Sequence, residues 1–302
     1  MLVGEHAEGV GDRGGVAGRA PFITQATNDL LDAWPVNGRA DVVDGLAVPL
    51  PVIVICELLG VPGTDRPLVQ RWSTELFAAG QPERTDETSH AVAGYMTDLI
   101  ATKRARPGCS LLDHLIDVRD GSDRLADDEL VSLAVLLLVA GHETTTNFIG
   151  NAVLALLQHP AALERLRRSP EEVPAALDEL LRFDSPVSTA TFRFTTESLV
   201  LGGTEIPARA PVLISLGAAN RDPDRFAAPD RLDLDRDAAG HLSFGHGIHR
   251  CLGAPLAKAE ADIALRTLLL RFPRLRAAVP PDQLNWRKTR LVRGLAGLPV
   301  LT

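Results

Sequence analysis

The chain has 302 residues, 45% of them hydrophobic, and a formal net charge of −8 at pH 7. This length and apolar content can bury one substantial core, and the acidic balance argues against nucleic acid as the main partner. The three cysteines offer no disulfide framework and suit a reducing compartment.

The first segment, residues 1–20, is rich in glycine and has no apolar periodicity. We therefore expect it to be irregular or disordered. Further along, the run VIVICELLGVP predicts a helix that Gly60 and then Pro62 bring to an end. Ser110 is well placed to cap the start of a later helix.

A long helix is predicted where apolar residues recur at helical spacing from Leu130 to Leu157, with Pro160 ending the run. Its middle, AGHETT at residues 140–145, interrupts the apolar pattern. Gly141 costs about 1 kcal/mol relative to alanine inside a helix, so we expect it to serve a close approach or a local bulge.

Glu143 and Thr144 are adjacent on this helix and therefore lie on different faces. Thr144 can point into a pocket while Glu143 points towards a water-filled channel. The alternative is a threonine that bonds back to its own helix beside a solvated glutamate. For this motif alone the two interpretations are evenly balanced.

Two other local patterns follow. Glu179 and Arg182 are three residues apart in a helical segment and can form an ion pair, which in the simplest case is a weak surface pair. Short β-rich runs flank Gly202 and Gly203, which predicts a hairpin.

The stretch FGHGIHRCLG, residues 244–253, is the most informative part of the sequence. It places Cys251 in a glycine-rich loop that leads into an amphipathic helix, where backbone amides and the helix dipole favour a thiolate. A zinc site made of His241, His246, His249 and Cys251 is one alternative, although there is no CxxC pair. An inert buried cysteine is the other. The loop favours presentation of a thiolate to haem iron.

The pattern FxxGxxxCxG followed by a helix resembles the haem-binding loop of the cytochrome P450 family. The AGHETT motif, the ExxR motif and the β-rich segment occur in the order expected for that family. The resemblance implies a mainly helical fold with small β-sheets, of the soluble bacterial type, in one domain over residues 21–302. Members usually carry about a hundred further residues before the point corresponding to residue 21, so we expect an N-terminally truncated version of the fold.

The resemblance also implies a role for individual residues. Cys251 would be the axial ligand of the iron of haem b (iron protoporphyrin IX), and Thr144 and Glu143 would manage protons during oxygen activation. Arg193 and His249 would bind the haem propionates. Further haem contacts are expected from Phe244, Gly245, Gly253, Ala140 and Gly141; a structural network from Glu179, Arg182 and Arg236; and the substrate pocket from Val187, Thr189, Leu291 and Val292.

The implied function is a monooxygenase that inserts one atom of dioxygen into a small hydrophobic substrate. Electrons would come from NAD(P)H through a ferredoxin-type or flavodoxin-type donor and its reductase, because the chain has no nucleotide-binding fingerprint of its own. We recognise no signal peptide or membrane anchor and expect a cytoplasmic protein without a membrane or nucleic-acid partner. The alternative is a catalytically impaired remnant that binds only haem, a ligand or a partner.

Overall fold

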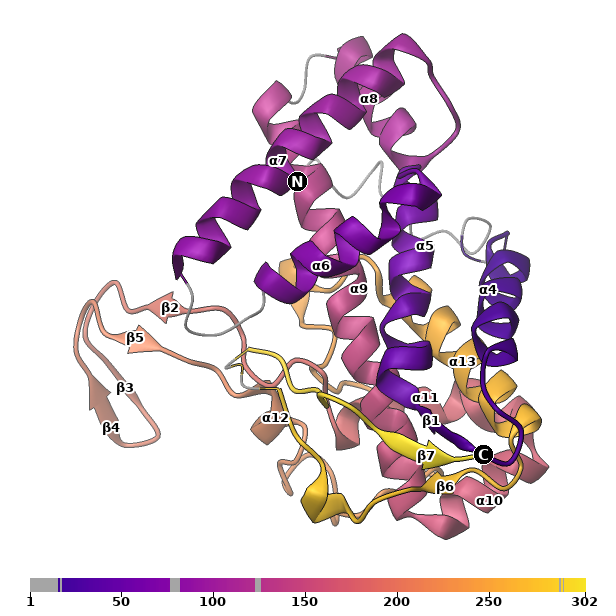
Figure 1. Cartoon of the computed structure of the whole chain (residues 1–302). Coiled ribbons are helices and arrows are strands. Elements are labelled where there is room, and N and C mark those ends of the chain that lie inside the picture. Colours follow the sequence, from indigo (N-terminus) through magenta and orange to yellow (C-terminus); the bar gives the residue numbers. More distant parts are fainter. Residues whose placement is uncertain (1–15, 17, 77–81, 123–125, 288, 290) are drawn as a thin grey trace.

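The computed structural model describes residues 16, 18–76, 82–122, 126–287, 289 and 291–302. Most of the segment 1–20, predicted to be irregular, lies outside these residues, and the first helix, α4 (Ala20–Asp32), begins at the end of that segment. The fold is mainly helical with small sheets, as the sequence predicts (Figure 1).

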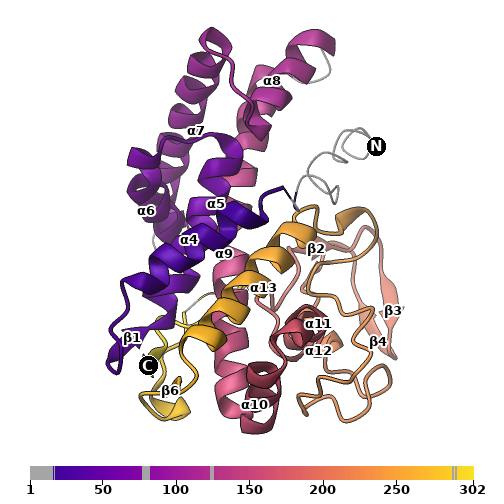
Figure 2. The same ribbon diagram turned by 90° about the vertical axis from the view of Figure 1, so that its right-hand side faces the viewer.

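The remaining helices surround one long helix, α9 (Asp127–Gln158), which spans the predicted helical run. The others are α5 (Pro49–Leu59), α6 (Arg66–Leu76), α7 (Pro82–Ala105), α8 (Leu111–Ser122), α10 (Pro160–Arg168), α11 (Val173–Phe183), α12 (Leu216–Ala219) and α13 (Ala254–Arg271). Helices α5, α7 and α13 all pack against α9, and α13 also lies beside α4 (Figure 2). By length and apolar composition α9 could cross a membrane, but the core helix of a water-soluble protein meets the same criteria.

Helix α5 packs against the half of α9 that carries the AGHETT motif. It ends as predicted, because Gly60 adopts a left-handed conformation with φ 68° and its amide bonds to the carbonyls of Cys56 and Glu57. A Cβ on Gly141 would lie 2.7 Å from Cδ1 of Ile55. Of the two roles predicted for Gly141, the structure therefore supports close approach, here between α9 and α5.

The start of α8 is fixed by a reciprocal cap. Oγ of Ser110 accepts the amide of Asp113 at 3.4 Å, and the Asp113 carboxylate accepts the amide of Ser110 at 2.8 Å. Nζ of Lys103, on α7, donates to both side chains at 2.9 Å. These bonds hold the pKa of Asp113 well below its usual range, even though its burial acts in the opposite direction. The predicted capping role of Ser110 is confirmed.

In the described part of the chain, three small antiparallel sheets accompany the helices. The first joins β1 (Arg39–Asp41), β7 (Pro299–Leu301) and β6 (Arg276–Ala277), so it ties the C-terminal strand to the segment after α4. The second pairs β2 (Arg193–Phe194) with β5 (Pro211–Val212). The third is the predicted hairpin of β3 (Leu199–Leu201) and β4 (Thr204–Ile206), in which Gly202 and Gly203 both have positive φ.

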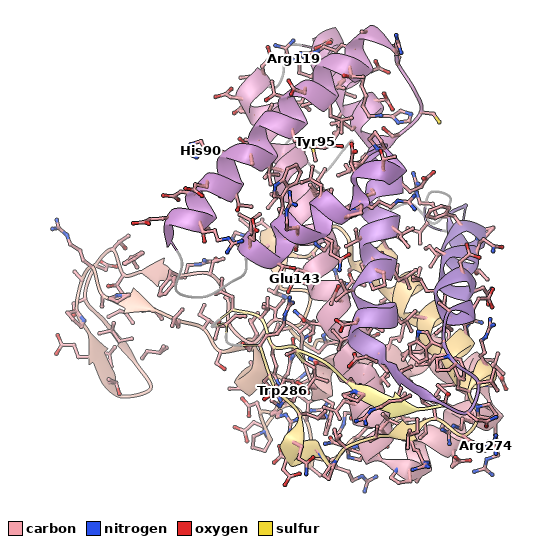
Figure 3. The ribbon with its side chains drawn as sticks, in the orientation of Figure 1. His90, Tyr95, Arg119, Glu143, Arg274 and Trp286 are labelled. Atoms are coloured by element: carbon pink, nitrogen blue, oxygen red, sulfur yellow. The ribbon has the colours of Figure 1, made fainter. Side chains whose placement is uncertain are left out.

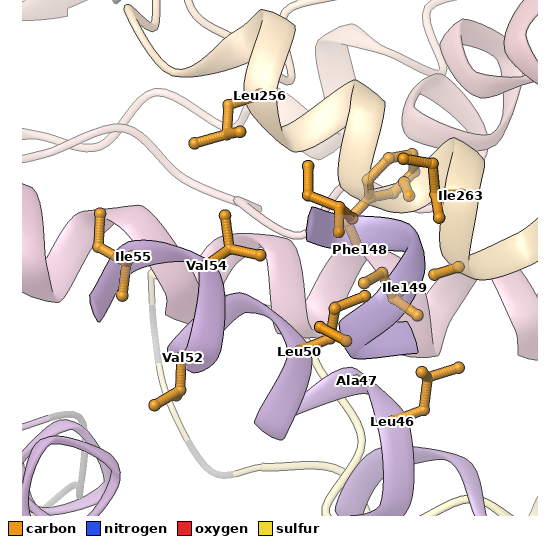
Figure 4. Packing of buried hydrophobic residues seen from close by; sticks show 14 of the residues in the cluster. Leu46, Ala47, Leu50, Val52, Val54, Ile55, Phe148, Ile149, Leu256 and Ile263 are labelled. Carbon is orange, nitrogen blue, oxygen red and sulfur yellow. The ribbon is translucent and has the colours of Figure 1, made fainter. Parts of the chain in front are cut away.

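The hydrophobic core includes a cluster where α5, α9 and α13 meet (Figure 4). Leu46, Leu50 and Ile149 are fully buried there, and Phe148 of α9 is almost so. This core fixes the position of the middle of α9 relative to α13, and therefore relative to the loop that precedes α13.

Candidate active site

A cavity of about 500 Å³ separates α9 from the loop that carries Cys251. Helix α9 contributes Thr144 and Phe148 to its wall. The opposite wall is the cysteine loop, and the segment after α11 closes one side. The predicted site residues that line this cavity are Thr144, Val187, Arg193, Phe244, Gly245, His249 and Cys251.

The cysteine loop is closed by its own backbone. The amide of Cys251 donates to the carbonyl of Phe244 at 2.7 Å, and a short 3₁₀ turn spans Gly247–His249. Gly245 has φ 70°, and a Cβ there would lie 2.7 Å from the carbonyl oxygen of His249. Only glycine satisfies both the backbone conformation and this close approach.

The thiol of Cys251 is exposed and receives hydrogen bonds from the amides of Gly253 and Ala254, where α13 begins. These amides and the charge of Arg250 lower its pKa, as the sequence predicts. The loss of water around the sulfur acts more strongly in the other direction, so the net effect raises the pKa above its usual value. The expectation that the loop by itself favours the thiolate is therefore wrong for the ligand-free protein.

Thr144 and Glu143 point into different spaces, as predicted from their adjacent positions on a helix. Thr144 lines the first cavity, and its hydroxyl donates to the carbonyl of Ala140 at 3.3 Å. The bond to its own helix, one of the two alternatives from the sequence, therefore coexists with the position in the pocket. Glu143 is buried and lines a second cavity of about 220 Å³.

The carboxylate of Glu143 pairs with the guanidinium of Arg287, and Oγ of Ser73 on α6 donates to it at 3.4 Å. Figure 3 shows Glu143 near the middle of α9, next to α6. Burial raises the pKa of Glu143, although Arg287 and Ser73 oppose this shift. The alternative interpretation, in which Glu143 is a solvated side chain, is therefore wrong.

His142 completes the polar wall of the second cavity. Its Nδ1 bonds to the carbonyl of Leu138 at 2.7 Å, while its Nε2 has no partner among the described residues. Burial lowers the pKa of His142 to about 4. Oγ1 of Thr146 is also buried without a partner in the described part of the chain, and a polar cavity of this size can supply water to both atoms.

The predicted network of Glu179, Arg182 and Arg236 forms, and it is buried. Nε of Arg182 donates to Glu179 at 2.6 Å and Nε of Arg236 does so at 3.2 Å. Arg182 also donates to the carbonyls of Asn220 and Pro229, both at 2.9 Å. Glu179 and Arg182 are therefore not the weak surface ion pair that was the simplest interpretation of the sequence.

Asn220 connects this network to the cysteine loop, and the sequence analysis missed it. Its side chain accepts the amide of Leu242 at 2.7 Å and donates to Oγ of Ser243 at 2.9 Å. Ser243 in turn donates to the carbonyl of Leu181 on α11 at 2.9 Å. Asparagine is common in loops, so no sequence signal distinguishes this one from a turn residue.

The other residues predicted to contact haem do not all lie on the cavity wall. Arg193 lies on the cavity wall, where its guanidinium bonds to Oγ1 of Thr191 at 2.6 Å, and His249 is exposed there. Gly253 caps α13 beside the thiol. Ala140 and Gly141 do not line the cavity, because Ala140 is exposed and Gly141 faces α5.

Three of the four predicted substrate residues take part in two isolated β-bridges. Val187 lines the cavity and pairs with Val292, which is buried, and Thr189 pairs with Ser215. Leu291 accepts the amide of Ser188 at 3.0 Å and its side chain is partly exposed. Of these four residues, only Val187 is on the cavity wall. Thr189, Leu291 and Val292 do not line the cavity.

The first cavity offers a donor set that fits haem. One soft sulfur ligand faces a wide, largely apolar space, and Arg193 and His249 supply donors for two carboxylates. Among the described residues no group of three or more His, Cys, Asp or Glu side chains converges as in a metal site, so the zinc alternative has no geometric support.

Comparison with known proteins gives one consistent match. The family model described as Cytochrome P450 matches residues 83–292. Cytochrome P450 107B1 of Saccharopolyspora erythraea is 48% identical over 285 residues, which are 94% of this chain and 70% of the relative. The 6-deoxyerythronolide B hydroxylase of the same organism is 45% identical over 93% of this chain and 70% of the relative. The structure of the tirandamycin C-bound P450 monooxygenase TamI superimposes with a TM-score of 0.91 at 45% identity and covers 99% of this chain and 73% of that chain.

Proposed function

The chain belongs to the cytochrome P450 family, and we propose that it is a haem-thiolate monooxygenase in which Cys251 is the axial ligand of the iron. The observation that carries the proposal is the position of Cys251 and Thr144 on opposite walls of one cavity. A thiolate on one side and a hydroxyl on the other are what oxygen activation at a haem between them requires.

Haem supplies the one-electron and dioxygen chemistry when it is bound. The chain's own residues would hold it: Cys251 would bind the iron, Arg193 and His249 would bind the propionates, and Phe244 and Gly245 would contact the ring. The buried network of Glu179, Arg182 and Arg236 has a structural role, because it fixes the segments that lead to the loop.

Proton delivery is assigned to the two residues at the middle of α9. The hydroxyl of Thr144 faces the reaction space and can exchange its bond to Ala140 for a bond to the reacting oxygen. Glu143 holds a proton more readily than an ordinary glutamate because burial raises its pKa, and the polar second cavity connects it to Ser73 and His142. Because Glu143 and Thr144 lie in different cavities, bulk water would be kept away from the substrate.

The substrate is proposed to be a hydrophobic organic molecule in which one C–H bond receives one atom of dioxygen. Phe148, Val187 and Ile214 give the cavity wall its apolar character, and two similar proteins are named for 6-deoxyerythronolide B and tirandamycin C. A ferredoxin-type or flavodoxin-type donor and its reductase would pass on electrons from NAD(P)H. We propose one catalytic domain over residues 21–302 in a cytoplasmic protein.

The decisive experiment is reconstitution of the purified chain with haem, followed by the spectrum of its reduced CO complex. We expect a stoichiometric band at about 450 nm, the mark of thiolate ligation. Cys251→Ser should abolish this band, while Cys109→Ser, at another exposed cysteine, should leave it intact. A 450 nm band that persists in Cys251→Ser would overturn the ligand assignment.

The alternative of a non-catalytic remnant is favoured by a different observation. Phe192, Phe194, Val200 and Leu201 are large apolar side chains that are more than half exposed on or beside β2 and β3, and such exposed groups accompany incomplete packing. The same spectrum separates the two functions, because a remnant would give substoichiometric haem or no band at 450 nm.

A further inference from the structure

Asp178 of α11 ties together the two elements that flank the cysteine. Its Oδ1 accepts a hydrogen bond from Nε2 of His241 at 3.1 Å and from Nζ of Lys258 at 2.5 Å. His241 belongs to the loop before Cys251, and Lys258 belongs to the first turns of α13 after it. The adjacent Glu179 serves the separate network around Arg182.

The hydrogen bonds of His241 determine its tautomer. The amide of Ser243 donates to Nδ1 of His241 at 3.2 Å, so Nδ1 acts as an acceptor and carries no proton. The proton of the neutral ring is then on Nε2, where it is donated to Asp178. Asp178 accepts this proton, and together with the amide of Ser243 it fixes the tautomer and the orientation of the ring.

His241 and Lys258 both contact the aromatic residue of the cysteine loop. The ring centroid of His241 lies 5.9 Å from that of Phe244, and Nζ of Lys258 lies 5.9 Å from the same centroid. The carbonyl of Phe244 accepts the amide of Cys251 at 2.7 Å. A short chain of contacts therefore runs from Asp178 through Phe244 to the backbone of Cys251.

None of the three polar residues lines the cavity shared by Cys251 and Thr144. Asp178, His241 and Lys258 instead line a separate cavity of about 270 Å³, and Phe244 lines both. The three side chains therefore act on the site through the loop residues that line both cavities, which include Phe244, Gly245 and His246.

We propose that Asp178 is a positioning residue for the cysteine loop, which acts by holding His241 in its Nε2–H tautomer and Lys258 against Phe244. The proposal rests on the proposed function, because it concerns the orientation of the thiolate that would bind haem. Residues outside the direct ligands commonly tune a metal site in this way. Nothing in it requires Asp178 to touch substrate or haem.

The first test uses the full chain without haem, so it does not depend on the ligand assignment. Amide hydrogen exchange is followed by mass spectrometry in peptides that cover residues 244–252. Asp178→Ala, which removes the acceptor of both bonds, should speed exchange there by about tenfold. The control is Asp230→Ala, at an exposed aspartate paired with Arg221. Equal exchange in Asp178→Ala and in this control would overturn the proposal.

The second test separates positioning from a general loss of stability. His241→Gln keeps an N–H that can reach Asp178, whereas His241→Leu does not. In the haem-loaded chain, His241→Leu should lower the fraction of haem with the 450 nm CO band by roughly twofold to tenfold, and His241→Gln should restore most of it. Equal bands in the two variants would contradict the tautomer argument. If the unaltered chain gives no such band, the proposed function fails, and hydrogen exchange still decides the role of Asp178.

Discussion

Glu143 and Thr144 are consecutive residues of α9, yet each lines a different cavity. The cavity of Thr144 also contains Cys251 and is mainly apolar. The cavity of Glu143 is polar and is lined by Arg287 and Ser73. The helix thus forms a wall between an apolar and a polar cavity, and under the proposed function these two neighbouring side chains are where protons would pass from one to the other.

The first prediction concerns Thr144. Thr144→Ala should leave haem binding unchanged but lower the amount of product per NAD(P)H consumed by about tenfold or more, since it removes a positioned proton carrier. Thr144→Ser, which keeps the hydroxyl, should behave like the unaltered chain. Product is measured by mass spectrometry with a hydrophobic trial substrate that the unaltered chain converts. Unchanged coupling in Thr144→Ala would show that the hydroxyl carries no proton.

The second prediction concerns the ion pair of Glu143 and Arg287, whose side chains are 5% and 23% exposed. Arg287→Met leaves the buried carboxylate without its counter-charge and should lower the free energy of unfolding by roughly 2–4 kcal/mol near neutral pH. Arg84→Met, in an exposed pair with Glu75, should cost about 1 kcal/mol or less.

The pH dependence tests the same ion pair. With Arg287 removed, the pKa of Glu143 in the folded state rises further above its unfolded value. The stability of Arg287→Met is therefore highest below the unfolded pKa and declines as the pH rises towards the folded pKa. Urea unfolding at pH 5 and pH 8 should show the greater loss at pH 8, and Glu143→Gln in the same chain should reverse much of it. A loss that does not depend on pH would contradict this account.

The third prediction concerns acid sensitivity. The folded-state pKa of His142 is lowered to about 4 from 6.5, so the unfolded chain binds the proton first as the pH falls. This histidine should therefore remove roughly 3 kcal/mol of stability between about pH 6.5 and pH 4. In His142→Asn, whose amide can still donate to Leu138, stability should fall less steeply over that range.

The matched control for His142 is His90 on α7. It makes the same bond to a carbonyl four residues earlier, at 2.8 Å, but it is exposed. His90→Asn therefore reports how loss of this local bond alone affects urea unfolding. Parallel curves for His142→Asn and the unaltered chain would mean that the folded protein accommodates the imidazolium.

Structural features that depend on residues close together in the chain could be predicted from the sequence. Helix α9, the glycine stop after α5, the Gly202–Gly203 turn and the pairing of Glu179 with Arg182 all follow from spacing within a few residues. The cysteine loop is recognisable because glycines and cysteine stand at fixed separations.

Contacts between distant segments could not be predicted in the same way. Arg287 lies 144 residues after Glu143, and nothing in its local pattern marks it as a partner. The same is true of Asp178, which lies 63 residues before His241. The direction of the pKa shift of Cys251 was also mispredicted, because helix position is visible in a sequence whereas the amount of water removed by the fold is not.

The last prediction concerns Gly141, where two effects of known sign compete. Alanine is favoured over glycine inside a helix by about 1 kcal/mol, but its Cβ would lie 2.7 Å from Cδ1 and 3.0 Å from Cγ1 of Ile55. Overpacking of this kind typically costs about 1–3 kcal/mol. We therefore expect Gly141→Ala to lower the free energy of urea unfolding, whereas Gly94→Ala on α7, where a Cβ meets nothing within 4 Å, should raise it.

A double-mutant cycle identifies the cause. Ile55→Val removes Cδ1 and should by itself cost roughly 0.5–1.5 kcal/mol. In that background Gly141→Ala should destabilise less than in the unaltered chain, because the shortest contact is removed while the contact with Cγ1 at 3.0 Å remains. If Gly141→Ala destabilises both backgrounds equally, the contact with Ile55 does not explain the glycine, and its backbone must be needed for another reason at the centre of α9.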